Sequence, residues 1–464
     1  MWVSIDKNVA VPMLRQVYQA IRDRILAGEL HAGYKLPSTR VLASQLNVSR
    51  NVILEAYEML LAEGLASARP GSGTYVAERA VLPGYVPAPP IAASASAMDT
   101  DYTNEVSVIS FRTGLPALEL FPRKSWADLL QSVCKEAPDL ALGYGDPAGE
   151  PELRRELADY LVRTRGVKAR PEHIVITSGA VQAIQLVTRL LLSAGDEVLV
   201  EEPTNEDLKS ILLATGATLR SMPVDDSGVI TADLPQINHP KLVYLTPSHQ
   251  FPLGGILPIQ RRIELIQYAA RTGCLLLEDD YDSEFWYDGA PVHSLQSLDP
   301  ERVLYVGTFS KILFPALRIG YIVLPPSRVA DFIRLKQLAD YQTASLEQIV
   351  LSRYIRKRLL HAHVHKMKKV YAKRRQVLLD SLEQHFTGQY RVCGRPAGLH
   401  LVAEFQFPLR EDLQECLRSE NVFAAQLEGN RLLMGYGHLN ESKIREGVIR
   451  IRKVTNPYPR KADL

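Results

Sequence analysis

A proline- and alanine-rich break over residues 78–106 is the feature that most restricts how this chain of 464 residues folds. It contains four closely spaced prolines, Pro83, Pro87, Pro89 and Pro90, followed by an alanine-serine run and an acidic polar run. Proline restricts φ, and no helical or strand period crosses the segment. Structureless loops longer than about 12–15 residues are uncommon inside compact domains. The sequence therefore predicts two modules, residues 1–77 and residues 107–464, joined by an extended linker.

The overall composition excludes several classes of protein. Hydrophobic residues make up 46% and charged residues 23%, as in an ordinary globular protein and unlike a disordered or fibrous chain. Lys and Arg number 54 and Asp and Glu 52, so the net charge of +2 predicts that any basic surface for nucleic acid is local. The four cysteines form no Cys-x-x-Cys pair, and we expect neither disulfides nor a metal site. No run approaches the ~20 apolar residues that cross a bilayer, so we expect a cytoplasmic protein without membrane contact.

Residues 12–77 carry the pattern of a helix-turn-helix followed by a hairpin. Apolar residues at helical spacing predict three short helices, the last of them capped by Ser49. The tight turn at Asn47 places the N-terminus of the third helix, with Arg50 and Asn51, where it can enter a major groove and pair with guanine or adenine. Two short strands then flank a glycine-containing turn, which predicts a wing.

Three segments of this module resemble the GntR-type winged-helix domain almost end to end: Leu36-Pro-Ser-Thr-Arg-Val-Leu-Ala, Val48-Ser-Arg-Asn and Arg69-Pro-Gly-Ser-Gly-Thr-Tyr-Val. The resemblance implies that the module binds double-stranded DNA. It places six residues at the family's DNA-contact positions: Arg40, Ser49, Arg50, Asn51, Arg69 and Gly71. A helical protein-docking module is the alternative, which the turn and the wing together disfavour.

In the second module, short β-branched or leucine-rich runs alternate with longer amphipathic ones. The apolar runs begin at Ile174, Val198, Leu242, Leu275, Val303 and Ile319. Strands that are apolar on both faces and alternate with helices predict a mostly parallel α/β sheet, here over residues 112–335. A long helix from about Ser345 and two later strand-like runs predict a smaller α+β part over residues 345–455.

Polar residues follow three strands of the predicted sheet, at the edge where open α/β sheets bind ligands. The first group is a small-residue turn at Gly179 that opens a helix, and its free amides suit a phosphate. In Glu278-Asp-Asp-Tyr, Asp279 and Tyr281 share one face of the strand. Lys311 follows the third strand, where a desolvated amine suits Schiff-base formation. A phosphate cradle, an acid, a phenol and a lysine together indicate a pyridoxal-phosphate site.

The spacing from Ser-Gly through Glu-Asp-Asp-Tyr to Ser-Lys-x-x-x-Pro-x-x-Arg-x-Gly-Tyr resembles the fold-type-I aminotransferases over roughly residues 111–454. The resemblance implies that Lys311 forms the Schiff base with pyridoxal 5'-phosphate, Asp279 binds the pyridine nitrogen and Tyr281 binds the ring hydroxyl. It assigns the phosphate to six residues: Gly179, Ala180, Val181, Thr308, Ser310 and Arg318. Arg431 matches the family's arginine for a substrate carboxylate, which its planar fork suits.

A winged helix linked to an aminotransferase-like domain is the architecture of the MocR/GabR-type bacterial regulators. Segments that look like this family include Phe111-Arg-Thr-Gly-Leu-Pro, Gly143-Tyr-Gly-Asp-Pro-Ala-Gly and Thr246-Pro-Ser-His-Gln-Phe-Pro. The resemblance implies a homodimer, formed through the aminotransferase-like domain, that binds repeated half-sites in an operator. It also implies a small amino compound as effector, and target genes of amino-acid, amine or vitamin B6 metabolism.

Three positions depart from these families. Phe251 stands where aminotransferases usually have an asparagine that bonds the cofactor's ring oxygen, which favours sensing over turnover. Asn205 and Asp207 occupy effector-side positions, and the acid at 207, where the GABA-responsive member has an arginine, would repel a carboxylate and prefer an amine. An active aminotransferase with a DNA-binding appendage is the alternative function. A repressor with the cofactor as a purely structural ligand is a third.

Residues 353–375 are strongly basic and have a helical pattern. A solvated helix face is the default interpretation, and contact with DNA flanking the operator is the alternative, because polycations attract phosphates. His361 and His365 stand one helical turn apart, but no nearby carboxylate completes a metal-ligand set.

Overall fold

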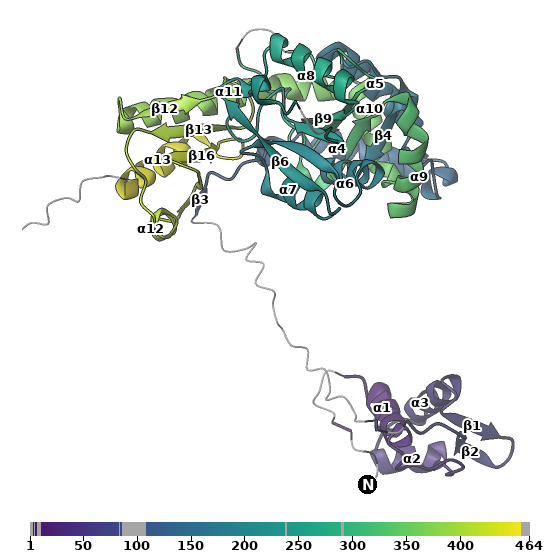
Figure 1. Cartoon of the computed structure of the whole chain (residues 1–464). Coiled ribbons are helices and arrows are strands. Elements are labelled where there is room, and N and C mark those ends of the chain that lie inside the picture. The colour runs from purple at the N-terminus through teal and green to yellow at the C-terminus, as the bar shows by residue number, and fades with distance from the viewer. Residues whose placement is uncertain are drawn as a thin grey trace, which may run out of the picture. The chain divides into compact units, whose positions relative to one another are not determined.

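The structure is a computed structural model that describes residues 3, 5, 6, 11–82, 84, 85, 108–236, 239–288 and 292–455. Contacts divide the chain into two compact units, Met1–Tyr102 and Thr103–Leu464, both drawn in Figure 1. Most of the linker expected over residues 78–106 lies outside the described residues.

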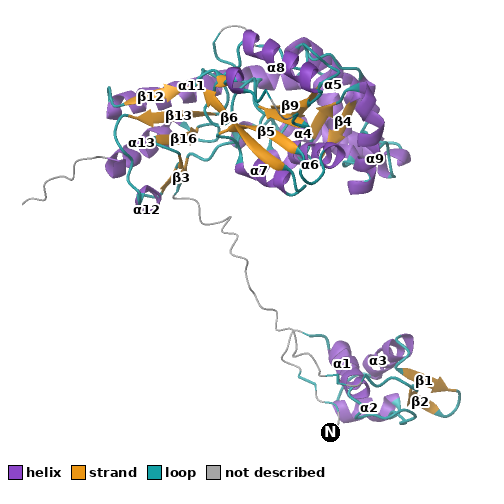
Figure 2. Ribbon diagram, viewed as in Figure 1, coloured by secondary structure: helices purple, strands orange, loops and turns teal. Residues whose placement is uncertain are grey.

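The first unit contains three helices and a two-stranded hairpin (Figure 2). Their bounds are α1 Met13–Leu26, α2 Thr39–Leu46, α3 Arg50–Ala62, β1 Ala66–Arg69 and β2 Gly73–Val76. Ser49 caps α3, because its hydroxyl accepts a hydrogen bond from the amide of Val52 at 3.4 Å. Asn47 ends α2 in the left-handed region, with φ 50° and ψ 53°, and turns the chain sharply into α3. The predicted winged helix-turn-helix is confirmed.

The core of this unit is built from the apolar faces of its helices. The fully buried side chains of α1 and α3 are Val17, Ile21, Ile25, Ile53, Ala56 and Leu60. Each large aliphatic side chain buried in this way contributes roughly 1.5–3 kcal/mol. Helix α2 turns Leu42, Ala43 and Leu46 inward and leaves Val41 49% exposed.

An eight-stranded sheet forms the centre of the second unit, in the order β4-β11-β10-β9-β8-β5-β6-β7. The strand bounds are β4 Ile174–Thr177, β5 Glu197–Glu202, β6 Thr218–Asp225, β7 Gly228–Val229, β8 Leu242–Leu245, β9 Leu275–Asp280, β10 Val303–Thr308 and β11 Gly320–Val323. Strands β10, β9, β8, β5 and β6 run parallel, whereas β11 and β7 pair antiparallel with their neighbours. The expected mostly parallel sheet is confirmed.

Helices cover both faces of this sheet (Figure 1). On one face lie α6 Ala180–Leu191, α7 Glu206–Leu213 and α9 Val329–Asp340; on the other lie α4 Arg123–Glu136, α5 Pro151–Arg165, α8 Ile259–Thr272 and α10 Ser345–Arg356. Because side chains alternate along a strand, Val175 packs into the first layer, and Ile174 and Ile176 pack into the second.

A smaller α+β part follows, as expected. A four-stranded antiparallel sheet has the order β12 Tyr390–Cys393, β13 His400–Phe405, β16 Arg431–Gly435 and β15 Ala425–Leu427. Helices α11 Leu359–Phe386, α12 Leu413–Ser419 and α13 Glu441–Thr455 accompany it, and β3 Ile109–Ser110 pairs in parallel with β14 Val422–Phe423. The single long helix expected from Ser345 is wrong: α10 and α11 are separate, and Arg358 between them has a positive φ of 59°.

Within the described part of the chain, no helix combines the length and the apolar character needed to cross a bilayer.

Candidate functional site

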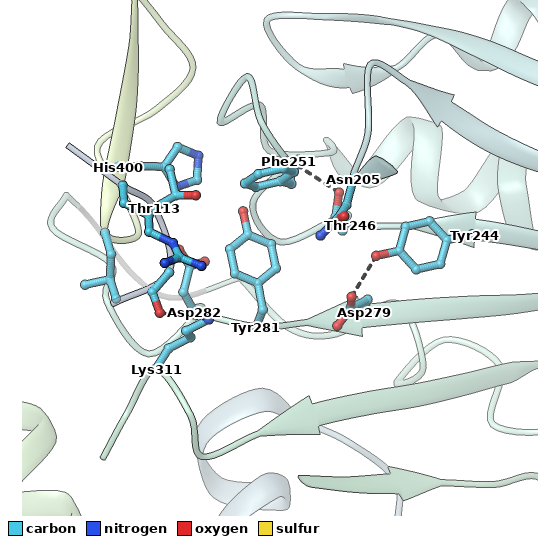
Figure 3. A pocket seen from close by; sticks show the side chains of 13 residues that line it. Thr113, Asn205, Tyr244, Thr246, Phe251, Asp279, Tyr281, Asp282, Lys311 and His400 are labelled. Carbon is cyan, nitrogen blue, oxygen red and sulfur yellow. Dashed lines mark hydrogen bonds between the residues drawn. The ribbon is translucent and has the colours of Figure 1, made fainter. Parts of the chain in front are cut away.

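A cavity of about 300 Å³ lies where β8 and β9 end at their carboxyl edges (Figure 3). Residues of the smaller part and of the segment before α4 complete its wall. The lining residues are Arg112, Thr113, Gly114, Asn205, Tyr244, Thr246, Phe251, Asp279, Tyr281, Asp282, Lys311, Leu399 and His400. The strand-end position is the one at which open α/β sheets bind ligands.

The two carboxylate oxygens of Asp279, a residue of the cavity lining, differ in their hydrogen bonding. The hydroxyl of Tyr244 donates a 2.7 Å hydrogen bond to Asp279 Oδ2, whereas the buried Oδ1 has no partner within the described residues. Burial raises the pKa of Asp279 to about 6, and the hydrogen bond from Tyr244 opposes this rise. A buried carboxylate with one open oxygen can accept a hydrogen bond from a protonated ring nitrogen.

Lys311 supplies an amine to the same cavity. Its Nζ donates a 2.8 Å hydrogen bond to the carbonyl oxygen of Gly114. Burial lowers the pKa of Lys311, which increases the uncharged fraction that can act as a nucleophile; Asp282 and Asp279 oppose the shift. Gly114 has a positive φ of 80°, which favours glycine, and a Cβ there would lie 2.8 Å from Lys311 Nζ and displace the amine.

Tyr281 is already engaged by the protein. Its hydroxyl donates to the carbonyl oxygen of His249 at 2.8 Å and lies 3.2 Å from His249 Nδ1. Asp282 Oδ1 lies 3.0 Å from the same Nδ1. Phe251 packs edge-on against the Tyr281 ring at 6.1 Å between ring centres and brings no donor to the cavity. In Figure 3, Tyr281 stands between Lys311 and the hydrogen-bonded Tyr244–Asp279 pair.

Three side chains of types that can bind a metal ion lie close together beside this cavity, and the sequence did not predict this group. Within the described ranges, ligand atoms of His249, Asp282 and His400 lie within 4.8 Å of one another. His249 is occupied by Asp282, and His400 Nε2 lies 3.0 Å from the carbonyl oxygen of Pro252. Burial beside His249 lowers the pKa of His400 to about 4. These contacts account for the three side chains without an ion.

The residues that the resemblance assigns to a phosphate come from two parts of the chain, the start of α6 and the segment around Lys311. Ser310 Oγ accepts a 3.0 Å hydrogen bond from Thr308, and Arg318 Nη2 donates at 2.7 Å to the carbonyl oxygen of Ser178. Gly179 has φ 96° and begins α6, whose first turn contains Ala180 and Val181. A Cβ at Gly179 would lie 2.9 Å from Arg318 Nη2. None of the six assigned residues lines the 300 Å³ cavity itself.

The remaining acids of the strand-end run face away from the cavity. Glu278 accepts hydrogen bonds from the amides of Leu295 and Gln296, both at 2.9 Å. Asp280 forms a fully buried ion pair with Arg165 at 2.8 Å. Alternation along β9 therefore leaves Asp279 and Tyr281 as the two members of this run that reach the cavity.

The three residues expected on the effector side are dispersed. Arg431 pairs with Glu404 at 2.9 Å and does not line the cavity. Asp207 is exposed in the first turn of α7, outside the lining. Asn205 does line the cavity, and its side-chain oxygen caps α7 by accepting from the amide of Asp207 at 2.8 Å. Arg112 lines the cavity and was missed, although it lies in the segment Phe111-Arg-Thr-Gly.

The six residues expected to contact DNA are exposed and fall into two places on the first unit. Arg50 and Asn51 begin α3, and Arg50 Nε donates to Thr39 Oγ1 at 3.3 Å. Ser49 precedes them as the cap, and Arg40 lies in the first turn of α2. At the wing, the guanidinium of Arg69 lies 4.6 Å from the centre of the Tyr75 ring, and Gly71 takes a positive φ of 71° in the turn.

The basic segment 353–375 is partly neutralised by the rest of its unit. Its ion pairs are Arg353–Glu136 at 2.9 Å, Arg356–Glu152 at 3.4 Å, Lys373–Glu441 at 3.1 Å and Arg374–Glu119 at 2.6 Å. His363 is buried against the carbonyl oxygen of Ile312, while His361 and His365 are exposed. Part of this segment is therefore structural rather than a solvated face.

Comparison with known proteins decides the family. The first unit matches the bacterial regulatory proteins of the gntR family over residues 14–76, and the second matches aminotransferase class I and II over residues 108–444. Over 470 residues the chain is 33% identical to the probable rhizopine catabolism regulatory protein MocR of Rhizobium meliloti, covering 97% of this chain and 94% of the relative. The chain belongs to the MocR-type transcriptional regulators.

Further similarities agree with this family. The chain is 31% identical to the pyridoxine biosynthesis transcriptional regulator PdxR of Corynebacterium glutamicum, over 86% of this chain and 85% of the relative. The structure of kynurenine aminotransferase from Pyrococcus horikoshii, in complex with PMP, has a TM-score of 0.70 and 28% identity, covering 75% of this chain and 91% of that chain. The MocR-type regulator expected from the two resemblances is confirmed, and it is favoured over an aminotransferase with a DNA-binding appendage.

Proposed function

We propose that this MocR-type regulator binds pyridoxal 5'-phosphate at the strand-end cavity. Its affinity for operator DNA changes when a small amino compound enters the same cavity. The observation that carries the proposal is that one cavity is lined by both Lys311 and Asp279, whose Oδ1 has no hydrogen-bond partner among the described residues, in a chain that also contains a winged-helix unit. Rhizopine catabolism and pyridoxine biosynthesis, named in two relatives, support target genes of amine or vitamin B6 metabolism. Such a regulator acts in the cytoplasm, where bacterial operators are.

The residues present fit the cofactor. Lys311 is the amine for covalent attachment, and the unpartnered Asp279 Oδ1 is an acceptor for the pyridine N–H. Gly179, Ala180, Val181, Thr308, Ser310 and Arg318 are the candidates for the phosphate, since the N-terminus of α6 and the Arg318 guanidinium both favour an anion. When bound, pyridoxal phosphate supplies an electrophilic carbonyl carbon that amines attack. Tyr281 would be the candidate partner of the cofactor's ring hydroxyl, and its own hydroxyl donates to the carbonyl oxygen of His249 in this structure.

The effector acts, in this proposal, by competing with Lys311. If an effector amine displaced Lys311 from the bound cofactor, the carbonyl oxygen of Gly114 and the carboxylates of Asp279 and Asp282 would be available to stabilise the Nζ ammonium. The side chain thus has two discrete arrangements that an effector can select between. Arg112, which also lines the cavity, has a guanidinium that suits an effector carboxylate.

A second copy of the chain completes the regulator. Leu140, Leu142, Tyr144, Leu338 and Tyr341 are between 64% and 83% exposed. The two segments that carry them lie together, because the Tyr144 and Tyr341 rings are 5.5 Å apart and Ser345 donates to the carbonyl oxygen of Ala141 at 2.5 Å. An apolar patch of this kind marks a contact surface. A homodimer that covers it carries two winged helices, which fits an operator with repeated half-sites.

The test uses the full-length chain saturated with pyridoxal phosphate. We expect an absorbance band at roughly 420 nm, typical of the protein-bound cofactor, that Lys311→Ala abolishes. Arg50→Ala keeps the band and loses binding to DNA from upstream of the regulated genes. A band unchanged in Lys311→Ala would overturn the cofactor assignment. Multiple turnovers with amino donors and 2-oxo acids, without any effect of amines on DNA binding, would overturn the sensor role.

A further inference from the structure

A second cavity, of about 310 Å³, lies between the C-terminal end of α5 and the N-terminal half of α11. It is lined by Tyr160, Arg163, Thr164, Arg165, Ser283, Glu284, Trp286, His361, Val364, His365 and Lys368. A neighbouring cavity of about 250 Å³ shares Tyr160, Arg163, Thr164 and His361 with it and adds Arg358. We call the two together the α5–α11 groove. The cofactor cavity and the α5–α11 groove have no lining residue in common.

Positive charge dominates this groove. Among the described residues, no carboxylate lies within ion-pair distance of Arg163, Arg358 or Lys368, and no Asp or Glu occurs in the sequence between Glu347 and Asp380. Glu284 is the carboxylate in the lining. Burial and the neighbouring Asp280 carboxylate raise its pKa, which disfavours its negative charge, and Tyr160 donates to it at 3.3 Å.

Two residues of the groove lining carry buried hydrogen-bond donors that the described protein leaves unused. Trp286 Nε1 and Ser283 Oγ are both buried and have no hydrogen-bond partner in the described part of the chain. An indole N–H can only donate, so it needs an acceptor that the described residues do not supply. Leaving a buried donor unpaired is unfavourable, and buried polar groups in native proteins are nearly always bonded.

We propose that the α5–α11 groove binds a small anion that carries phosphate or carboxylate groups. Arg163 and Lys368 contact its charge, and Trp286 and Ser283 donate hydrogen bonds to its oxygens. A small molecule is favoured over a DNA backbone because the two unused donors are buried, whereas the phosphates of a duplex stay at the protein surface.

The groove is placed to influence the cofactor cavity. Tyr281 and Asp282 line the cofactor cavity, and Ser283 and Glu284, the next two residues of the same turn, line the groove. Arg165 of the groove wall forms the buried ion pair with Asp280, the neighbour of Asp279. An anion that shifts this turn therefore acts on both walls. The inference goes beyond the proposed function and does not depend on the cofactor.

Binding is tested on the full-length chain saturated with pyridoxal phosphate, so that the cofactor's own phosphate site is filled. Isothermal titration uses pyrophosphate and succinate as probes, with one groove site per chain as the expected stoichiometry. Arg163→Ala and Lys368→Ala should each weaken binding about tenfold, equivalent to about 1.4 kcal/mol. Lys369→Ala is the matched control, because Lys369 neighbours Lys368, is exposed and lies outside the lining. Trp286→Phe should also weaken binding while leaving the melting temperature unchanged.

Three outcomes overturn the proposal. Equal loss of affinity in Lys368→Ala and Lys369→Ala would show diffuse attraction to α11 rather than a site. Full affinity in Trp286→Phe together with Arg163→Ala would place the anion elsewhere. Displacement of pyrophosphate by duplex DNA in an Arg50→Ala background would make a nucleic acid the occupant. The cofactor band near 420 nm, read in the same samples, separates failure of this site from failure of the proposed function, because the groove variants should all retain it.

Discussion

The hydroxyl of Tyr244 holds Oδ2 of Asp279 at 2.7 Å and leaves Oδ1, buried, without a partner in the described structure. The hydrogen bond favours the charged carboxylate, against burial, which favours the neutral acid. Tyr244 therefore helps to keep Asp279 ionised at neutral pH, and ionised Asp279 is the form that can stabilise a protonated pyridine nitrogen.

The first prediction concerns this pair. Tyr244→Phe removes a hydrogen bond to a charged group, worth about 1.5–3 kcal/mol, so the pKa of Asp279 rises further and affinity for pyridoxal phosphate falls about tenfold or more at pH 7. The loss should shrink at higher pH, where Asp279 ionises without help. Absorbance titration with the cofactor measures it. Tyr268→Phe is the matched control, because the buried Tyr268 hydroxyl has no partner to lose among the described residues. Equal affinities for the two variants would contradict the role of Tyr244.

The second prediction concerns DNA binding by the winged-helix unit. Arg50→Ala at the start of α3 and Arg69→Ala at the wing should each weaken DNA binding by about 1–3 kcal/mol, because both guanidinium groups are exposed at the predicted contact surface. Fluorescence anisotropy with labelled promoter DNA measures the affinity at two salt concentrations. Arg24, on α1, forms a surface ion pair with Glu29, and Arg24→Ala should leave the DNA affinity unchanged. Loss of affinity in Arg24→Ala as large as in Arg50→Ala would contradict this surface.

The third prediction separates two arginines. Arg112 lines the cavity, whereas Arg431 is held by Glu404. Arg112→Ala should therefore reduce the spectral response to amino carboxylates about tenfold or more while sparing the response to simple amines. Arg431→Ala should lose only a half-exposed ion pair, typically worth less than about 1 kcal/mol. A response lost in Arg431→Ala and kept in Arg112→Ala would restore the assignment made from sequence.

These arginines show how far the sequence could predict the site. The strand ends, Lys311 and the alternation that turns Asp279 and Tyr281 to one face are local patterns, readable from a few consecutive residues. The Arg431–Glu404 contact is a cross-strand pair between β16 and β13, set by a register that no local pattern shows. Arg112 reaches the cavity from a segment far from the strand ends in sequence. The family-like segment Phe111-Arg-Thr-Gly-Leu-Pro could have pointed to it, but nothing in the local pattern shows that this segment meets the strand ends.

The fold divides in the same way. Strands buried on both faces, such as β8 and β10, are apolar throughout and were predicted. Strand β6 was missed because it lies beside the edge strand β7 and its side chains are mostly exposed, so that its sequence lacks an apolar run. The break between α10 and α11 was missed because an arginine, rather than a glycine or proline, takes the positive φ there.

The fourth prediction concerns the apolar patch at Tyr144 and Tyr341. Tyr341→Asp places a charge in the centre of the surface proposed to bind a second copy, where its desolvation opposes association. Light scattering coupled to size exclusion should show a dimer for the unaltered chain and a monomer for Tyr341→Asp. Phe423→Asp, at an exposed apolar side chain on β14 outside the patch, is the control and should stay dimeric. A dimer in both variants would place the contact elsewhere.

The last prediction compares two neighbouring acids of β9 in the cofactor-free chain. Asp280→Asn leaves the buried Arg165 without its partner and should cost about 3–5 kcal/mol. Asp279→Asn should instead stabilise the chain at pH 7.5, because the pKa of Asp279 is raised from 3.8 to about 6 by burial. A raised carboxyl pKa means that folding disfavours the charged form, a penalty that grows as pH rises from about 4 to about 6 and stays constant above. The shift corresponds to a destabilisation on the order of 1–3 kcal/mol.

Relative to Asp279→Asn, the unaltered chain should therefore gain stability as pH falls from 7.5 to 5. Denaturant unfolding at both pH values measures the difference in stability. Parallel pH profiles of stability for the unaltered chain and for Asp279→Asn would contradict the prediction that burial of the charged Asp279 carboxylate destabilises the fold.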